Sequence, residues 1–428
     1  MKKLSITLIA VFLGLYVYAQ EEDQQEDKKK GKLAVEAQVR PRAELRNGAF
    51  TLRQEGEESA FFVSQRSRLT AVYTYDKISV GLSAQNVRVW GQSGQITRND
   101  GDLTTFNEAW AAYQFDEATS IKIGRQALSY DDQRILGALD WHQAGRWHDL
   151  ALFRYEPESF TLHAAAGVSQ DNENVLGNFY REPGGNYKNM QMLWFEKPLS
   201  ESYRFSLLLL NTGFEVASDS STSYMQTMGG NFYKTGDLLD LTATFYYQAG
   251  ENTVGQDVNA LLASLYGSYQ LTQKFFLLGG VDYVSGESMI DGGADDSQAF
   301  NPLYGTHHKF YGLMDYFYVG NPHGNVGLFD QFLGLAFAPS PQLKFQLTGH
   351  HFNAAAELAG EAGNPTADLG TELDFTFLWK AEEYLTIVGG YSQMFATENM
   401  ETIKGGENDV VNNWAWLMFN FRPVIYQN

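Results

Sequence analysis

The sequence predicts an all-β protein, namely a transmembrane, antiparallel, up-and-down β-barrel of about eighteen strands. Three observations carry this prediction. Apolar and polar residues alternate through about eighteen segments, short connections alternate with long ones, and aromatic residues recur just before the short connections. An even number of strands suits a closed barrel in which every strand runs antiparallel to its neighbours.

The first 31 residues are expected to lie outside the barrel. Residues 1–19 have Lys2 and Lys3 ahead of an apolar run and end in small or aliphatic residues, as a secretory signal peptide does. Residues 20–31, QEEDQQEDKKKG, form a charged tract that we expect to be flexible. The barrel should therefore span residues 32–428. No other apolar stretch approaches the roughly 20 residues of a membrane-spanning helix.

Composition excludes several classes of function. The formal net charge of −20 argues against a nucleic-acid partner. Nucleophile motifs, phosphate-binding loops and histidine-rich metal motifs are absent, so we expect no enzyme, no catalytic residue, no cofactor and no metal site. With no cysteine in the chain, stability must come from packing and backbone pairing.

The first strand shows the two-sided pattern. In LAVEAQVRPRAELR, from Leu33 to Arg46, every second residue is apolar or Pro41, and the residues between them are mainly charged. The segments LDLTATFYYQ and LGTELDFTFLW alternate in the same way. In a membrane barrel the apolar face touches lipid and the polar face lines the lumen.

The connections predict two different rims. The short ones contain YDKIS, FDEATSI, YEPESF, EKPLSESY, YKTGDLL, YQLTQKF, APSPQLK and KAEEYLT. Between them lie longer connections, including 91–104, 125–146, 169–186 and 287–328. This alternation places turns at one end of the barrel and loops at the other. We expect 287–328 to be a long extracellular loop and its aromatic segment 310–318 to be a lid or plug that lies against the barrel mouth.

Aromatic residues recur at one depth in the strands. Such a row is typical of the girdle at a membrane interface. The residues are Tyr73, Tyr75, Tyr113, Phe115, Tyr155, Trp194, Phe195, Phe232, Tyr233, Tyr266, Tyr269, Phe337 and Trp379.

Arginines on the first two strands are the candidate functional residues. Arg40, Arg42 and Arg46 share the polar face of the first strand, and Arg66 and Arg68 follow on the next. A permanently charged guanidinium suits transient bidentate contacts with the carboxylates of a passing anion. The alternative is that Glu36, Glu44 and Glu108 neutralise these arginines in a structural network, and the two interpretations are compatible.

The stretch from residue 124 to 153 is the richest in polar groups. We expect Arg125 to Asp149 to form a loop that, because of its paired charges, folds back on the barrel wall or constricts the pore. Its sequence includes Gly124-Arg125-Gln126, Asp132-Gln133-Arg134, Trp141, Gly145-Arg146 and Asp149. These motifs, with FNEAWAAY at 106–113 and AFNPLYGTHHKFYGLMDYF at 299–317, resemble those of the alginate export family of outer-membrane porins.

The resemblance implies an eighteen-stranded barrel whose arginine-lined lumen conducts an anionic polysaccharide. It implies that Arg66, Arg68, Arg125, Arg134 and Arg146 are the positive residues of the conduit. Their implied partners in the lumen are Asp131, Asp132 and Asp149, and Glu108 on the fourth segment is a further candidate.

The sequence therefore predicts a passive channel in the outer membrane of a Gram-negative bacterium. The expected substrates are an anionic polysaccharide, an oligosaccharide or small anions, and the expected surroundings are outer-membrane lipids. The alternatives are a general diffusion porin and a sealed barrel that serves adhesion or surface assembly. A periplasmic partner, the direction of transport and the oligomeric state are left open.

Overall fold

The computed structural model describes residues 30–94, 103–180, 186–216, 220–290, 296–319, 325–359 and 367–428. The predicted signal peptide, residues 1–19, lies outside the described residues. The charged tract also lies outside them up to residue 29.

Eighteen strands of the described chain form the wall. The first nine are β1 (Lys32–Asn47), β2 (Ala60–Tyr75), β3 (Ile78–Val89), β4 (Thr104–Gln114), β5 (Thr119–Gln126), β6 (His148–Tyr155), β7 (Thr161–Val168), β8 (Asn189–Pro198) and β9 (Tyr203–Glu215). The others are β10 (Thr222–Lys234), β11 (Leu239–Glu251), β12 (Asp257–Gln270), β13 (Phe275–Val284), β15 (Leu328–Ser340), β16 (Leu343–Asn353), β17 (Asp368–Glu382), β18 (Leu385–Ala396) and β19 (Asn412–Phe421).

Four short elements complete the described structure. Strand β14 (Asp296–Ser297) pairs with β12, and β20 (Val424–Gln427) pairs with the beginning of β1. The 3-10 helix η2 (His307–Lys309) lies between β14 and β15, and helix α2 (Glu398–Lys404) lies between β18 and β19. No helix among the described residues is long and apolar enough to cross a membrane.

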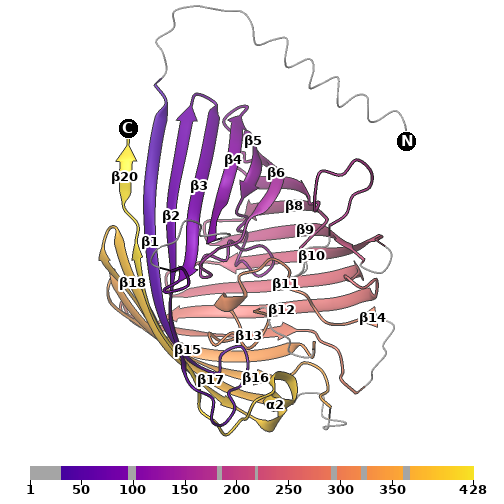
Figure 1. The fold of residues 1–428 in the computed structure, drawn as a ribbon, viewed down its shortest axis with the longest axis vertical. Helices are drawn as coiled ribbons and strands as arrows, with labels where there is room; N and C mark the ends of the chain where they lie inside the picture. Colours follow the sequence, from indigo (N-terminus) through magenta and orange to yellow (C-terminus); the bar gives the residue numbers. More distant parts are fainter. Residues whose placement is uncertain are drawn as a thin grey trace, which may run out of the picture.

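The wall is a closed antiparallel barrel, as the sequence predicts (Figure 1). Each wall strand pairs with the next one along the chain, and β19 returns to pair with β1 through contacts such as Arg42 with Met418. Closure leaves no long unpaired edge, which a barrel in lipid requires because its backbone groups cannot bond to water there. The prediction of eighteen strands is confirmed.

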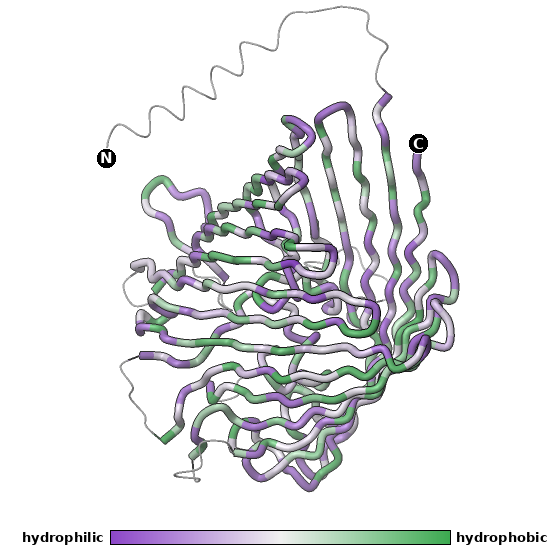
Figure 2. The backbone as a smooth tube through the Cα atoms, turned by 180° about the vertical axis from the view of Figure 1, so that it is seen from behind, coloured by the Kyte–Doolittle hydropathy of each residue, from purple (hydrophilic) through white to green (hydrophobic). Residues whose placement is uncertain are grey.

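The two faces of each strand differ as the alternation predicts. On β9, Leu207 and Leu209 are 51% and 54% exposed on the outside, whereas Leu208 and Leu210 are 1% and 2% exposed on the inside. Figure 2 shows the same alternation of hydrophobic and hydrophilic residues along many strands. An outward apolar band of this kind is what contacts lipid.

The connections differ between the rims as predicted. Eight short turns join β2 to β3 and every second pair after it, and the longer loops emerge from the opposite rim. Aromatic side chains pack against one another near the turn rim, as in Tyr113 with Phe115 and Phe275 with Phe337, whose ring centroids are 5.1 and 4.7 Å apart. Phe337 continues the row to Phe345, so these rings form the beginning of a belt around the wall.

Two of the long connections fold into the barrel. We call residues 127–147 and 298–319 together the plug. Its apolar side chains are buried, with Ile135 at 2%, Tyr311 at 2% and Phe317 at 1% exposure. Together with inward apolar wall residues such as Phe352, these side chains form a hydrophobic core inside the barrel.

The two parts of the plug are joined by backbone pairing. Leu136 and Tyr304 form a parallel bridge, and the Tyr304 amide donates to the carbonyl of Ile135 at 3.0 Å. The Arg146 guanidinium donates to the carbonyl of Gly305 at 2.7 Å. These contacts make the two loops one packed unit, and the segment 310–318 lies inside the barrel instead of at its mouth.

Candidate functional site

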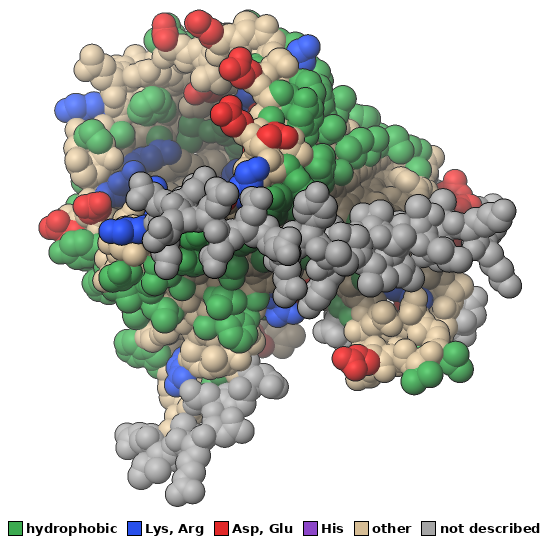
Figure 3. All heavy atoms as spheres, turned by 90° about the horizontal axis from the view of Figure 1, so that it is seen from above, with side chains coloured by type: hydrophobic (Ala, Val, Ile, Leu, Met, Phe, Trp, Pro, Cys, Tyr) green, Lys and Arg blue, Asp and Glu red, His purple; other side chains and the backbone are tan. Residues whose placement is uncertain are grey.

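Five arginines of β1 and β2 point into the barrel. Their outward neighbours Val39, Leu45 and Leu69 are 43%, 40% and 50% exposed, so the residues between them face inward. The register places Arg40 opposite Arg66. We call Arg40, Arg42, Arg46, Arg66 and Arg68 the basic ladder. Seen from above, basic side chains lie around the hollowed part of the surface (Figure 3).

Asp140 of the plug bridges two rungs of this ladder. Its Oδ1 accepts from the Arg66 Nη2 at 2.8 Å, and its Oδ2 lies 3.3 Å from the Arg40 Nη1. Arg40 and Arg66 are 2% and 1% exposed. The surrounding protein tends to raise the pKa of the partly desolvated Asp140 carboxyl, but the charges of Arg66 and Arg40 outweigh this effect and hold the pKa below its usual value.

Neutral groups of the plug satisfy more of the ladder's donors. Arg40 donates to the carbonyl of Asp140 at 2.8 Å and to that of His142 at 3.2 Å. The Gln143 side chain accepts from Arg40 Nε at 3.1 Å and donates to Ser64 Oγ at 3.1 Å. The ladder therefore holds the first part of the plug in place.

Glu44 neutralises the upper rungs from within the same strand. Its carboxylate accepts from Arg42 Nε at 2.8 Å and from Arg46 Nη2 at 2.7 Å. The Trp414 indole donates to it as well, at 3.1 Å. The Arg42 guanidinium also lies 4.3 Å from the ring centroid of Trp141 in the plug. This part of the ladder is a structural network, one of the two interpretations that the sequence allows.

Arg68 is the most accessible rung toward the turn rim. It is half-buried, and its guanidinium donates to Gln85 Oε1 at 3.0 and 2.5 Å. Within the described ranges it makes no ion pair. It lines a cavity of about 340 Å³ together with Arg66, Asp140, Glu108 and Arg422. Glu36, the other carboxylate of this cavity, pairs with Arg422 at 2.6 Å.

Glu108 lies on the same cavity but does not contact the ladder. Its carboxylate accepts a hydrogen bond from the indole of Trp110 at 2.9 Å. It therefore contributes negative charge to this part of the lumen without an ion pair to any described arginine.

Arg134 joins the plug to the wall. Its guanidinium contacts Asp132 at 2.8 Å and Asp282 of β13 at 2.7 Å, and it also donates to the hydroxyl of Tyr311 at 3.2 Å. Arg134 is 4% exposed. Its position inside this network makes it an anchor of the plug, and its contact Asp132 is one of the partners that the resemblance implies for the arginines. Arg146, which binds the Gly305 carbonyl, is a second such anchor, and burial lowers the pKa of its guanidinium to about 10.

Asp131 has no arginine partner in the described structure. Its carboxylate accepts hydrogen bonds from Trp194 Nε1 at 3.0 Å, from the Tyr233 hydroxyl at 3.3 Å and from the Tyr246 hydroxyl at 3.4 Å. These donors come from β8, β10 and β11, so Asp131 fixes the beginning of the plug to a different part of the wall.

The placement of Arg125 and Asp149 in the lumen is wrong. Both lie on wall strands, β5 and β6, and not in the loop between them. Arg125 shares the face of Ile123, which is 54% exposed, and Asp149 shares that of Phe153, which is 40% exposed. They form an ion pair of 2.8 Å on the outer face of the barrel. The error arises because β5 extends two residues beyond Gly124, which the sequence places at the end of the strand.

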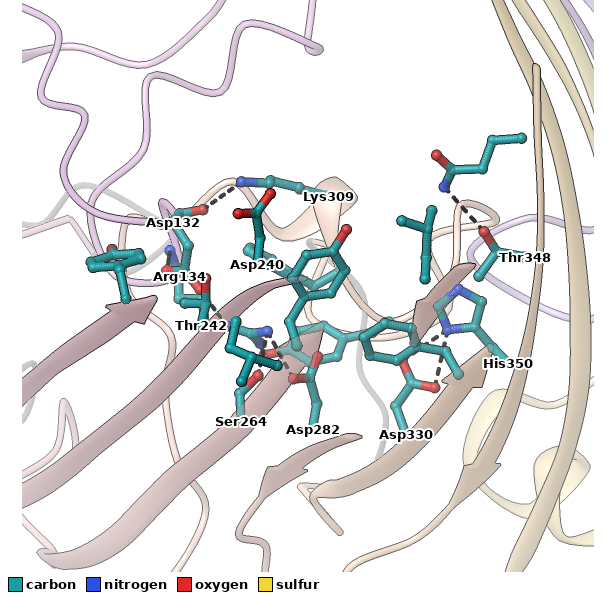
Figure 4. Close-up of a pocket in the computed structure, with 18 of the residues that line it drawn as sticks. Asp132, Arg134, Asp240, Thr242, Ser264, Asp282, Lys309, Asp330, Thr348 and His350 are labelled. Carbon is teal, nitrogen blue, oxygen red and sulfur yellow. Dashed lines mark hydrogen bonds and ion pairs between the residues drawn. The ribbon is translucent and has the colours of Figure 1, made fainter. Parts of the chain in front are cut away.

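A second cavity, of about 690 Å³, lies along the inner face of β9 to β17. Its lining is rich in carboxylates, and Figure 4 shows Asp282 directed at Arg134 and Asp330 at His350. His350 lies 2.9 Å from Asp330 and 3.7 Å from Asp374. The same lining includes Arg134, Arg204, Lys234 and Lys309, so the lumen has a region of mixed charge in addition to the basic ladder. This region cannot be predicted from the sequence because its charged residues are far apart in the chain.

Comparisons with known proteins agree with this architecture. The family model described as alginate export matches residues 32–411. A search of curated proteins gives no match. OccAB4 of Acinetobacter baumannii has a similar structure, with a TM-score of 0.63, 10% identity and coverage of 94% of this chain and 100% of that one.

Two further solved structures share the fold. OpdO of Pseudomonas aeruginosa has a TM-score of 0.63 and 13% identity, and the match covers 92% of this chain and 98% of that one. A BenF-like porin of Pseudomonas fluorescens Pf-5 has a TM-score of 0.62 and 12% identity, with 92% and 99% of the two chains covered. At these identities the likeness concerns the fold. The family match over residues 32–411 shows that this chain belongs to the alginate export family and, with the closed porin-like barrel, that it is an outer-membrane channel.

Proposed function

We propose that this channel conducts anions that carry carboxylates, namely an anionic oligosaccharide or polysaccharide or smaller anions of the same kind. The observation that carries the proposal is the cavity at the turn rim, which the half-buried Arg68 lines and behind which Arg66 lies buried. Membership of the alginate export family supports the same class of substrate.

The proposed mechanism is electrostatic and passive. A guanidinium in a wall of low dielectric constant lowers the cost of bringing an anion into the lumen. A carboxylate beside the path, Asp140, keeps each contact weak enough for the anion to leave. The mechanism requires neither a catalytic residue nor a cofactor. The source is proposed to be a Gram-negative bacterium, and outer-membrane lipids are the proposed partners of the apolar outer face.

The test is the single-channel conductance of the refolded protein in a planar bilayer, with the reversal potential measured under a salt gradient. We expect anion selectivity and blockade by alginate fragments. Arg68→Gln should shift the reversal potential toward cation selectivity and weaken the blockade. Arg125→Gln removes the same charge from the outer face and should leave both unchanged.

Two outcomes contradict the proposal. A protein that forms no conducting pore in the bilayer supports the sealed barrel. An open pore without anion preference, whose selectivity Arg68→Gln leaves unchanged, supports the general diffusion porin.

A further inference from the structure

Asp140 differs from the other carboxylates of the ladder in its exposure. Its side chain is 68% exposed, although the side chains of its partners Arg40 and Arg66 are only 3% and 1% exposed. By contrast, the side chain of Glu44, which neutralises the upper rungs, is 0% exposed. Asp140 therefore presents a carboxylate from the side of the open cavity to two buried cations.

The contacts of Asp140 leave part of the arginine pair unused. It makes one contact to each guanidinium, through Oδ1 to Arg66 and through Oδ2 to Arg40. The Arg66 Nε is buried and has no hydrogen-bond partner among the described residues. A guanidinium can bind a carboxylate through two parallel N–H donors, so Arg66 has the capacity to bind an incoming carboxylate more fully than it binds Asp140.

We propose that Arg40 and Arg66 form a carboxylate subsite of the conduit and that Asp140 occupies it as an internal competitor of the substrate. This inference rests on the proposed function. A substrate carboxylate entering from the cavity displaces Asp140, whose exposed side chain turns toward the lumen. When the substrate leaves, Asp140 returns.

Exchange of one carboxylate for another explains how a buried arginine pair can take part in transport. An uncompensated buried charge is costly, so an empty subsite would hold a substrate carboxylate tightly and release it slowly. Because Asp140 replaces the departing anion, neither binding nor release leaves Arg40 and Arg66 without a counter-charge. The carbonyl groups of Asp140 and His142 and the Gln143 side chain hold Arg40 in position.

The plug geometry permits this movement of a single side chain. The backbone on both sides of Asp140 is fixed, since Leu139 donates through its amide to Thr306 Oγ1 at 3.2 Å and the carbonyl of Trp141 accepts from Arg42 at 2.9 Å. Rotation of the Asp140 side chain therefore frees the subsite without unfolding the loop.

The decisive experiment compares Asp140→Asn with the parent channel, using the concentration of alginate fragments that half-blocks the current. A competitor that fills nine-tenths of the subsites weakens the apparent affinity about tenfold, so the variant should be half-blocked at about a tenth of the concentration. Carboxyl-reduced fragments, which lack the charge, should block both proteins equally. Asp140→Ser, with a smaller side chain, is a second variant that tests whether the asparagine amide of the first one itself binds the arginines.

Two matched controls separate competition from a change in overall charge. Glu108→Gln removes one negative charge from the same cavity without touching Arg40 or Arg66, and it should change the half-blocking concentration by less than about twofold. Asp149→Asn removes one from the outer face and should have no effect. Retention of the folded form is checked by the altered gel mobility of the unheated barrel.

The outcomes distinguish this inference from the proposed function. If fragments block the parent channel, but Asp140→Asn and Asp140→Ser are no more sensitive than Glu108→Gln, the competitor is disproved and the anion channel stands. If the parent channel shows neither anion selectivity nor blockade, the proposed function fails and the inference fails with it.

Discussion

Asp131 shows how a single carboxylate makes the stability of the plug depend on pH. Burial raises the pKa of this carboxyl above its usual value, and this outweighs the hydrogen bond from Trp194. Its contribution to stability is therefore greatest below the pKa of the unfolded chain and is lost as the pH rises through the higher pKa of the folded state. An uncharged amide at this position escapes that loss.

We predict that Asp131→Asn raises the melting temperature relative to the parent protein more at pH 8 than at pH 4. Thermal unfolding in detergent micelles at the two pH values measures this difference. Asp149→Asn, on the exposed outer face, provides the comparison. An equal effect of Asp131→Asn at both pH values would show that the carboxyl is not destabilised by burial.

Arg134 is the residue whose loss should damage the plug most. Arg134→Gln leaves Asp282 buried without its cation, and breaking a buried ion pair in this way costs about 3–5 kcal/mol. We expect faster hydrogen exchange and faster proteolysis within 127–147, with the wall strands unaffected. Adding Asp282→Asn should restore part of the protection, because it removes the unpaired charge. If Asp282→Asn restores no protection, the effect of Arg134→Gln does not come from the loss of this ion pair.

At the scale of the element, Glu372 fixes the second part of the plug to the wall. Its Oε1 accepts from the amides of Leu313 and Met314 at 2.6 and 2.9 Å. Each of these hydrogen bonds is worth about 0.5–1.5 kcal/mol. We predict that Glu372→Ala loosens residues 310–318 and increases cleavage by trypsin after Lys309. Glu382→Ala, at the exposed end of the same strand, should leave cleavage unchanged, and equal cleavage in both variants would refute the tether.

The stability of the plug should fall in acid because of His307, which lies in the 3-10 helix η2. Burial, with a smaller contribution from the charge of Arg146, lowers the pKa of His307 to about 4, while contacts with the carbonyls of Pro302 and Tyr318 and the charge of Asp315 act in the opposite direction. Because the folded pKa lies below the usual value of about 6.5, the plug loses stability as the pH falls from that value toward 4. We expect larger current fluctuations at pH 4.5 than at pH 7. His307→Gln should reduce this difference, and an undiminished difference would assign it to other groups.

The sequence predicts the elements better than the contacts between them. Alternation with a period of two is local, so the strands, their two faces and the inward position of Arg40 and Arg66 can be read directly. The pairing of Asp140 with Arg66 joins residues 74 positions apart and depends on how the loop folds back. Arg125 was misplaced for a local reason, because the exact end of β5 decides whether it belongs to a strand or a loop.

At the scale of the whole molecule, a rigid wall surrounds a plug that is held by side chains. The wall closes through a continuous antiparallel ladder, whose hydrogen bonds cannot be replaced by water in the membrane. The plug instead depends on a few contacts with inward residues, among them Asp140 with Arg66, Arg134 with Asp282, and Glu372 with the amides of 313 and 314. A change in the width of the path must therefore come from the plug.

This difference predicts that tethering the plug to the wall suppresses passage of large anions. Ser64 of β2 and Gln143 of the plug lie 3.1 Å apart at their side-chain ends, and the chain has no cysteine of its own. We expect Ser64→Cys with Gln143→Cys, joined by a short bifunctional thiol reagent, to abolish the flux of alginate fragments into liposomes while chloride conductance persists. Either cysteine alone, treated with the same reagent, should retain the flux. Unchanged flux through the tethered protein would mean that the path lies beside a plug that stays in place.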